Sequence, residues 1–312
     1  MIILTLRLLI LGNLLRIILC ISGGENATIG QFPHQVSLQL QIGIKRVHVC
    51  GGSIISPNWI LTSAFCLDSH MVDACKIDVL VNTISVNIGG QRYEIAEFYK
   101  HDEFDRDTLM HDIALIRLKN NILFCNGVNA VELAAKEPAD GSVCQLSGWG
   151  YPSVTNETVP NLQHANTTKI PCRPYKMSYS LNDRNLCSFS NSIRVYVGDY
   201  GSPLLFDKMQ VGVVSWELFF EGNRTEIVVY TSVAKYRDWI QERISKNDGP
   251  ICNCTTNNTI NTSQTSSTVL IIVIFILVLV TVNLCLTSWN SRQIKRIVKS
   301  DRRTLQSGSI EW

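Results

Sequence analysis

Short runs of alternating apolar and polar residues, separated by Gly, Asn, Asp and Pro, recur from Ile21 to about Lys246. Examples are HQVSLQL, CKIDVLV, IALIRL and QVGVVSW. A period of two places successive side chains on opposite faces of a strand, so each run is typical of a strand with one buried face. Many such runs between turn residues predict an all-β domain, either a sandwich or a barrel, because propensity does not distinguish the two.

One helix is predicted at the end of this region, over Ser232 to Ser245. Val233, Tyr236, Ile240 and Ile244 recur there at helical spacing and give the helix an apolar face. Residues 248–268, rich in Thr, Ser and Asn and without an aromatic residue, are interpreted as a solvated, glycosylated stalk.

The N-terminal segment, residues 1–20, is rich in Ile and Leu and is followed by small and polar residues. This pattern predicts a secretory signal peptide cleaved after Cys20. Arg7 and Arg16 interrupt the apolar run, and an uncleaved signal anchor is the alternative interpretation.

A second apolar segment, VLIIVIFILVLVTVNLCL, begins at Val269 and holds no ionisable group except one thiol. Extended to Trp289, it is long enough to cross a hydrocarbon core of about 30 Å. A buried helix in a globular core would be expected to carry a polar stripe, which this segment lacks. The sequence therefore predicts a transmembrane helix over residues 269–289.

The residues flanking this segment predict its orientation in the membrane. Six basic residues follow it, whereas its upstream flank is polar and uncharged: Arg292, Lys295, Arg296, Lys299, Arg302 and Arg303. Residues 290–312 are therefore predicted to be a cytoplasmic tail, and the chain a single-pass type I protein of the cell membrane with an extracellular β domain. The seven Asn-x-Ser/Thr sequons agree with this topology: Asn26, Asn156, Asn166, Asn223, Asn253, Asn257 and Asn261.

Eleven cysteines in a secreted context argue for disulfides. Excluding Cys20 in the leader and Cys285 in the predicted span leaves an odd number, so one thiol either remains free or links two chains into a disulfide-bonded dimer. The formal net charge of +2 gives no basis for nucleic-acid binding. No metal-ligand cluster, phosphate-binding loop or cofactor motif is recognised, so no cofactor or metal is expected.

Seven motifs along the chain indicate a family resemblance. In order they are ISGG, CGGSIISPNWILTSAFC, HDIALIRL, CQLSGWG, GDYGSPL, VGVVSW and VVYTSVAKYRDWIQ. Together they resemble the trypsin-like serine proteases over Ile21 to about Gln241. The resemblance implies two perpendicular six-stranded β-barrels with a C-terminal helix, in a domain spanning residues 21–247.

The resemblance also locates the catalytic positions. Family chemistry needs a serine nucleophile, a histidine base and an aspartate that orients the base. Phe65 stands at the histidine position and Tyr200 at the serine position, while Asp112 keeps the aspartate. Without an imidazole to orient, Asp112 is interpreted as structural, with the hydroxyl of Ser215 as its expected hydrogen-bond donor.

Further site residues follow from the same resemblance. Gly198 and Asp199 are a remnant of the oxyanion loop, and an amine freed at Ile21 by signal cleavage is expected to pair with Asp199. The former specificity pocket is expected to be filled, because side chains replace two of its glycines, at Glu217 and Val228. Its residues are Arg194, Ser215, Trp216, Glu217 and Val228.

Family disulfides are expected between Cys50 and Cys66 and between Cys172 and Cys187. The pairing of five other cysteines is left open: Cys75, Cys125, Cys144, Cys252 and Cys254.

The expected function is that of an inactive protease homologue on the cell surface, which binds an extracellular protein or peptide. Two alternatives remain. One is a hydrolase with residual or altered activity, and the other is an adhesion or receptor protein that signals through its short tail, whose terminal SIEW resembles a PDZ ligand.

Overall fold

The computed structural model describes residues 24–68, 76–125, 127–150, 161–175, 181–190, 194–196, 198–219 and 226–246. By its internal contacts the chain divides into two units, Met1–Thr255 and Thr256–Trp312, and every described residue lies in the first. The predicted leader, stalk, membrane span and tail lie outside the described residues.

Six strands close into the first barrel. They are β2 (Gln35–Ile42), β3 (Lys45–Ser56), β4 (Trp59–Thr62), β5 (Ile77–Val81), β6 (Gln91–Lys100) and β7 (Ala114–Leu118). Their order around the barrel is β2-β3-β4-β7-β6-β5, and β5 pairs with β2 to close it. A two-residue turn joins β2 to β3, with Gly43 at a φ of 62°, which glycine adopts without strain.

The second barrel is also six-stranded. Its strands are β9 (Val143–Gly148), β10 (Gln163–Ile170), β11 (Asn185–Ser190), β12 (Pro203–Phe206), β13 (Met209–Phe219) and β14 (Glu226–Ser232). Their order is β9-β10-β11-β14-β13-β12, and β12 pairs with β9 to close the barrel. Two short strands add to its edges: β1 (Glu25–Asn26) pairs with β10, and β8 (Glu132–Leu133) runs parallel to β13.

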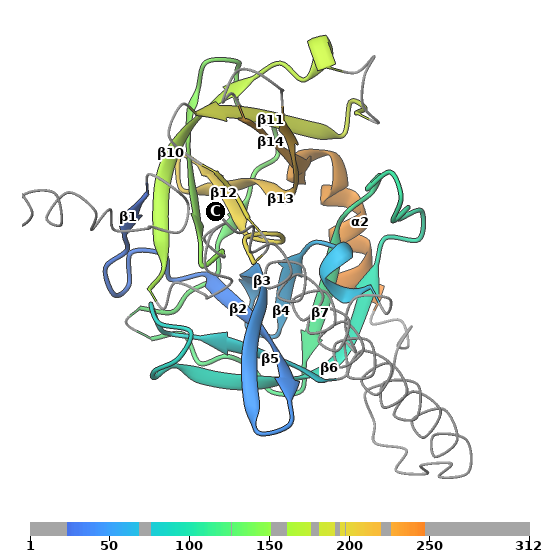
Figure 1. Cartoon of the computed structure of the whole chain (residues 1–312). Coiled ribbons are helices and arrows are strands. Elements are labelled where there is room, and N and C mark those ends of the chain that lie inside the picture. Colours follow the sequence, from blue (N-terminus) through green and yellow to red (C-terminus); the bar gives the residue numbers. More distant parts are fainter. Residues whose placement is uncertain are drawn as a thin grey trace, which may run out of the picture. The chain divides into compact units, whose positions relative to one another are not determined.

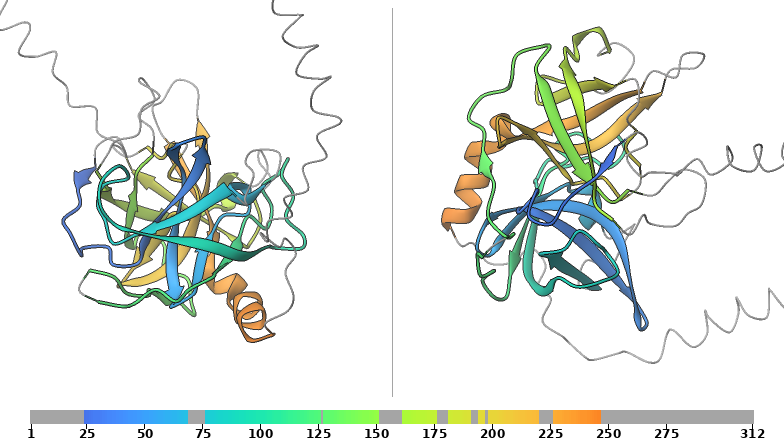
Figure 2. Two further views of the ribbon diagram at one scale, coloured as in Figure 1. Left: turned by 90° about the horizontal axis from the view of Figure 1, so that it is seen from below. Right: turned by 90° about the vertical axis from the view of Figure 1, so that its left-hand side faces the viewer.

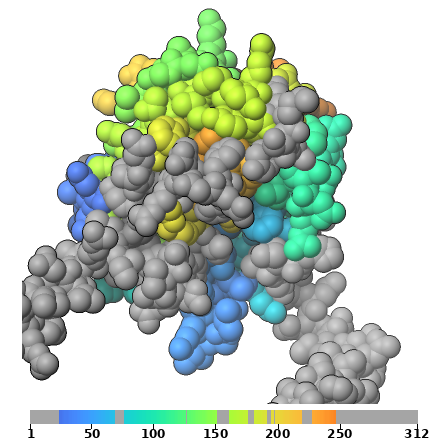
Figure 3. Space-filling view, turned by 45° about the horizontal axis from the view of Figure 1, so that its top comes forward, coloured from blue at the N-terminus to red at the C-terminus, as the bar shows by residue number. Residues whose placement is uncertain are grey.

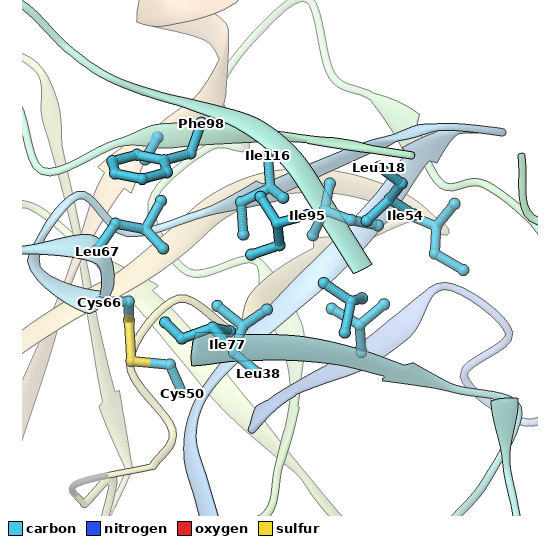
Figure 4. Packing of buried hydrophobic residues seen from close by; sticks show 14 of the residues in the cluster. Leu38, Cys50, Ile54, Cys66, Leu67, Ile77, Ile95, Phe98, Ile116 and Leu118 are labelled. Atoms are coloured by element: carbon cyan, nitrogen blue, oxygen red, sulfur yellow. A yellow bond between two sulfur atoms is a disulfide. The ribbon is translucent and has the colours of Figure 1, made fainter. Parts of the chain in front are cut away.

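The pairing of β5 with β2 and of β12 with β9 closes each sheet on itself. Of the sandwich and the barrel that the sequence left open, the structure therefore has barrels. The right-hand view of Figure 2 shows the barrels one above the other. Inward-facing apolar side chains fill the first barrel, as the alternating pattern predicts. Figure 4 shows this core, including Leu38, Ile54 and Ile116, with the Cys50–Cys66 disulfide beside it.

The helix α2 (Val233–Lys246) follows β14 directly and agrees with the predicted helix to within one residue at each end. Val233, Tyr236 and Ile240 are buried, and they pack against residues of both barrels, such as Leu115 and Val213. The helix therefore lies along one side of both barrels (Figures 1 and 2). Two 3₁₀ turns complete the described elements: η1 (Phe65–Leu67) and η3 (Arg173–Tyr175).

No helix among the described residues combines the length and apolar character needed to span a membrane. The predicted span, residues 269–289, is not among those residues.

Candidate functional site

The three residues predicted at the catalytic positions meet where the two barrels face each other. Phe65 begins η1 after β4, and Asp112 precedes β7, so both belong to the first barrel. Tyr200 lies in the turn before β12 of the second barrel. The fold thus brings together residues that are far apart in the sequence.

Phe65 and Tyr200 contact each other edge to face. Their ring centroids are 5.9 Å apart and their planes lie at 84°, a favourable geometry for two aromatic rings. Both rings are half-buried. Tyr200 also packs against the hydrophobic cores of both barrels, so its ring fills space at their junction.

Asp112 is fully buried and its carboxylate accepts several hydrogen bonds. Ser215 donates its hydroxyl to Oδ2 at 2.6 Å, as predicted. Ser63 donates its hydroxyl to Oδ1 at 2.6 Å, and the Phe65 amide donates to the same oxygen at 2.8 Å. Burial raises the pKa of Asp112, while these hydroxyls and the amides of Phe65 and Ala64 act in the opposite direction. In the part of the chain that the structure describes, hydroxyls and backbone amides donate to this carboxylate and no imidazole does.

The phenol of Tyr200 is far from an ionised nucleophile. Burial raises its pKa to about 12, and the negative charges of Glu217, Asp199 and Asp112 act in the same direction. The hydroxyl is therefore neutral at physiological pH.

Asp199 lies just before Tyr200 and is fully buried. Its carboxylate accepts the amides of Gly150 at 2.8 Å and Tyr196 at 3.0 Å. Burial raises its pKa to about 7, against the effect of these two amides. A Cβ on Gly148 or Gly150 would lie 2.1 Å from a carboxylate oxygen of Asp199, so glycine is required at both positions. Ile21, its predicted partner, lies outside the described residues.

The neighbouring Gly198 has a φ of 104° and is held by a buried histidine. His48 Nε2 lies 2.9 Å from the Gly198 carbonyl oxygen, and His48 Nδ1 lies 2.8 Å from the hydroxyl of Ser37. Burial lowers the pKa of His48 to about 4, so the ring is neutral at pH 7. Because a carbonyl only accepts, Nε2 donates to Gly198 and Nδ1 accepts from Ser37.

Comparison with known proteins now decides the family. Residues 21–240 match the family model for trypsin. The chain belongs to the trypsin family. It is 34% identical over 226 residues to trypsin alpha of Drosophila erecta and of Drosophila melanogaster, which covers 70% of this chain and 86% of each relative. Among solved structures it is similar to neuropsin, a serine protease expressed in the limbic system of mouse brain. The TM-score is 0.63 at 27% identity, covering 71% of this chain and 98% of neuropsin.

The residues predicted to line the former trypsin-family pocket lie on β13, on β14 and before Gly198. The strand register places Glu217 directly opposite Val228. Val228 is buried in the core of the second barrel, and Ser215 is buried against Asp112. Arg194, Trp216 and Glu217 are half-buried. That side chains at Glu217 and Val228 fill the former pocket stays a prediction.

Two disulfides have the pairing that the trypsin-family resemblance implies: Cys50 with Cys66 and Cys172 with Cys187. Among the described cysteines, Cys125 is free and exposed, and Cys144 is free and buried. Burial raises the pKa of Cys144 to about 11, which keeps it a thiol. Cys75, Cys252 and Cys254 lie outside the described residues.

Two predicted glycosylation sites are described. Asn26 on β1 and Asn166 on β10 are both exposed. The remaining five lie outside the described residues: Asn156, Asn223, Asn253, Asn257 and Asn261.

Two contributors to this site were missed in the sequence. The resemblance to trypsin-like proteases implies the sequence Thr-Ala-Ala-His-Cys at residues 62–66, and Ser63 stands where its first alanine is expected. This departure was the available signal that Ser63 donates to Asp112. The hydrogen bond between His48 and Gly198 joins residues 150 positions apart in the sequence. No local pattern marks a contact of that range.

Proposed function

We propose that this chain is a catalytically inactive trypsin-family homologue. The observation that supports it most strongly is the contact between Phe65 and Tyr200, two aromatic rings at the positions of the base and the nucleophile. Phenylalanine accepts no proton, and peptide cleavage by this family requires a base to activate the attacking oxygen. In another serine protease, loss of either group costs on the order of 10⁶ in turnover.

A hydrolase that uses Tyr200 is the alternative that this geometry argues against. With a pKa of about 12, on the order of one phenol in 10⁵ is ionised at pH 7. No described histidine forms a hydrogen bond to its hydroxyl, so the nucleophile is left without activation.

The β domain is proposed to bind a protein or peptide at the face that carries Phe65 and Tyr200. Phe65 and Tyr200 are half-buried rather than fully buried, and Trp216 on β13 is also half-buried. Rigid aromatic side chains with partial exposure are the residues that most often anchor protein interfaces. The predicted leader, sequons and membrane span support display on the cell surface as a type I protein, and the exposed Cys125 offers a thiol for a disulfide-linked dimer. Signalling through the short tail is a further role that would add to binding.

The binding proposal is tested on cells that carry the full chain. Chemical crosslinking of wild-type protein, Phe65→Ala/Tyr200→Ala and Phe124→Ala is compared. Phe124 is an exposed aromatic residue outside the site and serves as the matched control. We expect the wild type and Phe124→Ala to capture a partner saturably. The double variant should lose this capture. Equal capture by all three would place binding elsewhere.

A further inference from the structure

A cluster of two histidines and a glutamate lies in the loop between β6 and β7. His101 follows the last residue of β6, and His111 lies just before Asp112. One ligand atom from each of His101, Glu103 and His111 falls within 4.8 Å of the others. The loop lies beside α2 in Figure 1 and at the surface in Figure 3, where it is teal green at the right.

The rings of the two histidines are held by the fold. They stack with centroids 4.8 Å apart and planes at 20°. Because imidazole lone pairs lie in the ring plane, one of the two rings must turn before both can bind the same ion. Two rings of α2 flank His101, Tyr236 at 5.3 Å and Trp239 at 5.2 Å. His111 adopts a φ of 55°, in the left-handed region that few residues other than glycine occupy.

A hydrogen bond with Tyr236 fixes the ring of His111, whose other nitrogen faces Glu103. Its Nδ1 lies 3.0 Å from the hydroxyl of Tyr236, and its Nε2 lies 3.6 Å from Oε2 of Glu103. A histidine that binds a metal through one nitrogen usually has the other fixed by such a partner. The distance of 3.6 Å exceeds that of a normal hydrogen bond.

We propose that His101, Glu103 and His111 form a binding site for a divalent transition-metal ion, with Zn²⁺ as the ion that fits this ligand set best. Two imidazoles and one carboxylate are a recognised zinc ligand set, in which water completes the tetrahedral coordination.

Metal binding has an identifiable structural cost. His101 Nδ1 now accepts a hydrogen bond from the Glu103 amide at 3.2 Å. Coordination through Nδ1 uses that lone pair, and coordination through Nε2 places the ring proton on Nδ1, so either mode breaks this bond. The bond is long, and its loss is small beside the formation of three metal–ligand bonds. The metal proposal does not depend on the proposed inactivity or on ligand binding at Phe65 and Tyr200, because the cluster shares no side chain with that pair.

The test uses the untagged full-length protein in a mild detergent, titrated with ZnCl₂ against a competing chromophoric chelator. The variants are Glu103→Gln and, as matched control, Asp102→Asn. The Glu103 side chain is 73% exposed, so its replacement leaves packing intact. Asp102 is adjacent and also negative, but it pairs with Arg243 instead of the cluster.

One equivalent of Zn²⁺ is expected to bind the wild type, with affinity reduced at least about tenfold in Glu103→Gln. Asp102→Asn should stay within about threefold of the wild type, because only charge and no ligand is lost. With Co²⁺ in place of Zn²⁺, visible bands without a thiolate charge-transfer band would separate this site from one built by cysteines. Equal affinity in the wild type and Glu103→Gln, an equal loss in both variants, or a thiolate band would overturn the proposal.

Discussion

Ser63 and Asp112 are joined by a hydrogen bond of 2.6 Å, donated by the serine hydroxyl to Oδ1 of the carboxylate. The family resemblance implies alanine at the position of Ser63 and an imidazole at the position of Phe65. A buried carboxylate that loses an imidazole donor needs another. Ser63 supplies such a donor to Oδ1.

Replacing Ser63 by Ala should destabilise the fold. Oδ1 of a fully buried carboxylate would lose a hydroxyl donor, and a hydrogen bond to a charged group is worth about 1.5–3 kcal/mol. Urea unfolding of the wild type and the variant measures the difference. Ser245→Ala is the control, because Ser245 lies on the exposed end of α2 and its loss should cost less than about 0.5 kcal/mol. Equal stability of Ser63→Ala and the wild type would show that Asp112 does not depend on this hydroxyl.

The free energy of unfolding should depend on pH through Asp199. The expectation applies to protein that keeps residues before Ile21, in which Ile21 has no free amine to pair with Asp199. Its pKa of about 7 lies above the unfolded value of about 3.9, so the folded state holds a proton that the unfolded state releases. This contribution to stability is therefore present at low pH and is lost as pH rises to about 7.

The stability of the wild type relative to Asp199→Asn should therefore fall by about 2 kcal/mol from pH 5 to pH 7. His34 and His48, whose pKa values are lowered to about 4 by burial, also titrate differently on unfolding, but they are present in both proteins and cancel in the comparison. Urea unfolding of the wild type and Asp199→Asn at pH 5 and pH 7 measures this difference in stability. Protein that begins at Ile21 should show no such fall between pH 5 and pH 7, because its amine would favour the ionised carboxylate and Asp199 would then be ionised in both the folded and the unfolded state. A difference that does not change with pH would contradict the assignment to Asp199.

Much of this fold could be predicted from the sequence, because strand runs, the helical face of α2 and the two family disulfides are local or motif-borne features. Ser215 as a donor to Asp112 followed from the resemblance. The hydroxyl of Ser63 could not be placed without the turn geometry that aims it. The proximity of His101 and His111 could not be predicted from their spacing, because the loop that joins them contains positive φ values at Leu109 and His111, of 53° and 55°.

Tyr200 is expected to act through its ring and not through its hydroxyl. Tyr200→Phe should change the free energy of unfolding by less than about 0.5 kcal/mol. Tyr200→Ala should cost about 2–3 kcal/mol, because the ring packs against both barrel cores and Phe65. Thermal or urea unfolding separates the two variants. A loss in Tyr200→Phe as large as that in Tyr200→Ala would assign the role to the hydroxyl.

The exposed Asn26 and Asn166 should carry glycans if the β domain faces the outside of the cell. Asn26 Oδ1 accepts a hydrogen bond from Gln163 at 2.5 Å, and a sugar on its nitrogen would leave that bond intact. Asn26→Gln and Asn166→Gln should each remove one glycan, seen as a smaller mass shift on glycosidase treatment of the cell-expressed protein. Unmodified asparagine at both sites would argue against an extracellular domain.

Catalytic inactivity is tested most directly by incubating purified wild-type protein and Tyr200→Phe with a broad peptide library and a serine-reactive fluorophosphonate. Neither protein should cleave a peptide above the buffer control, and neither should be labelled, because Phe65 leaves no base and the Tyr200 phenol has a pKa of about 12. Peptide cleavage by the wild type that Tyr200→Phe abolishes would contradict this and show that the phenol is a nucleophile.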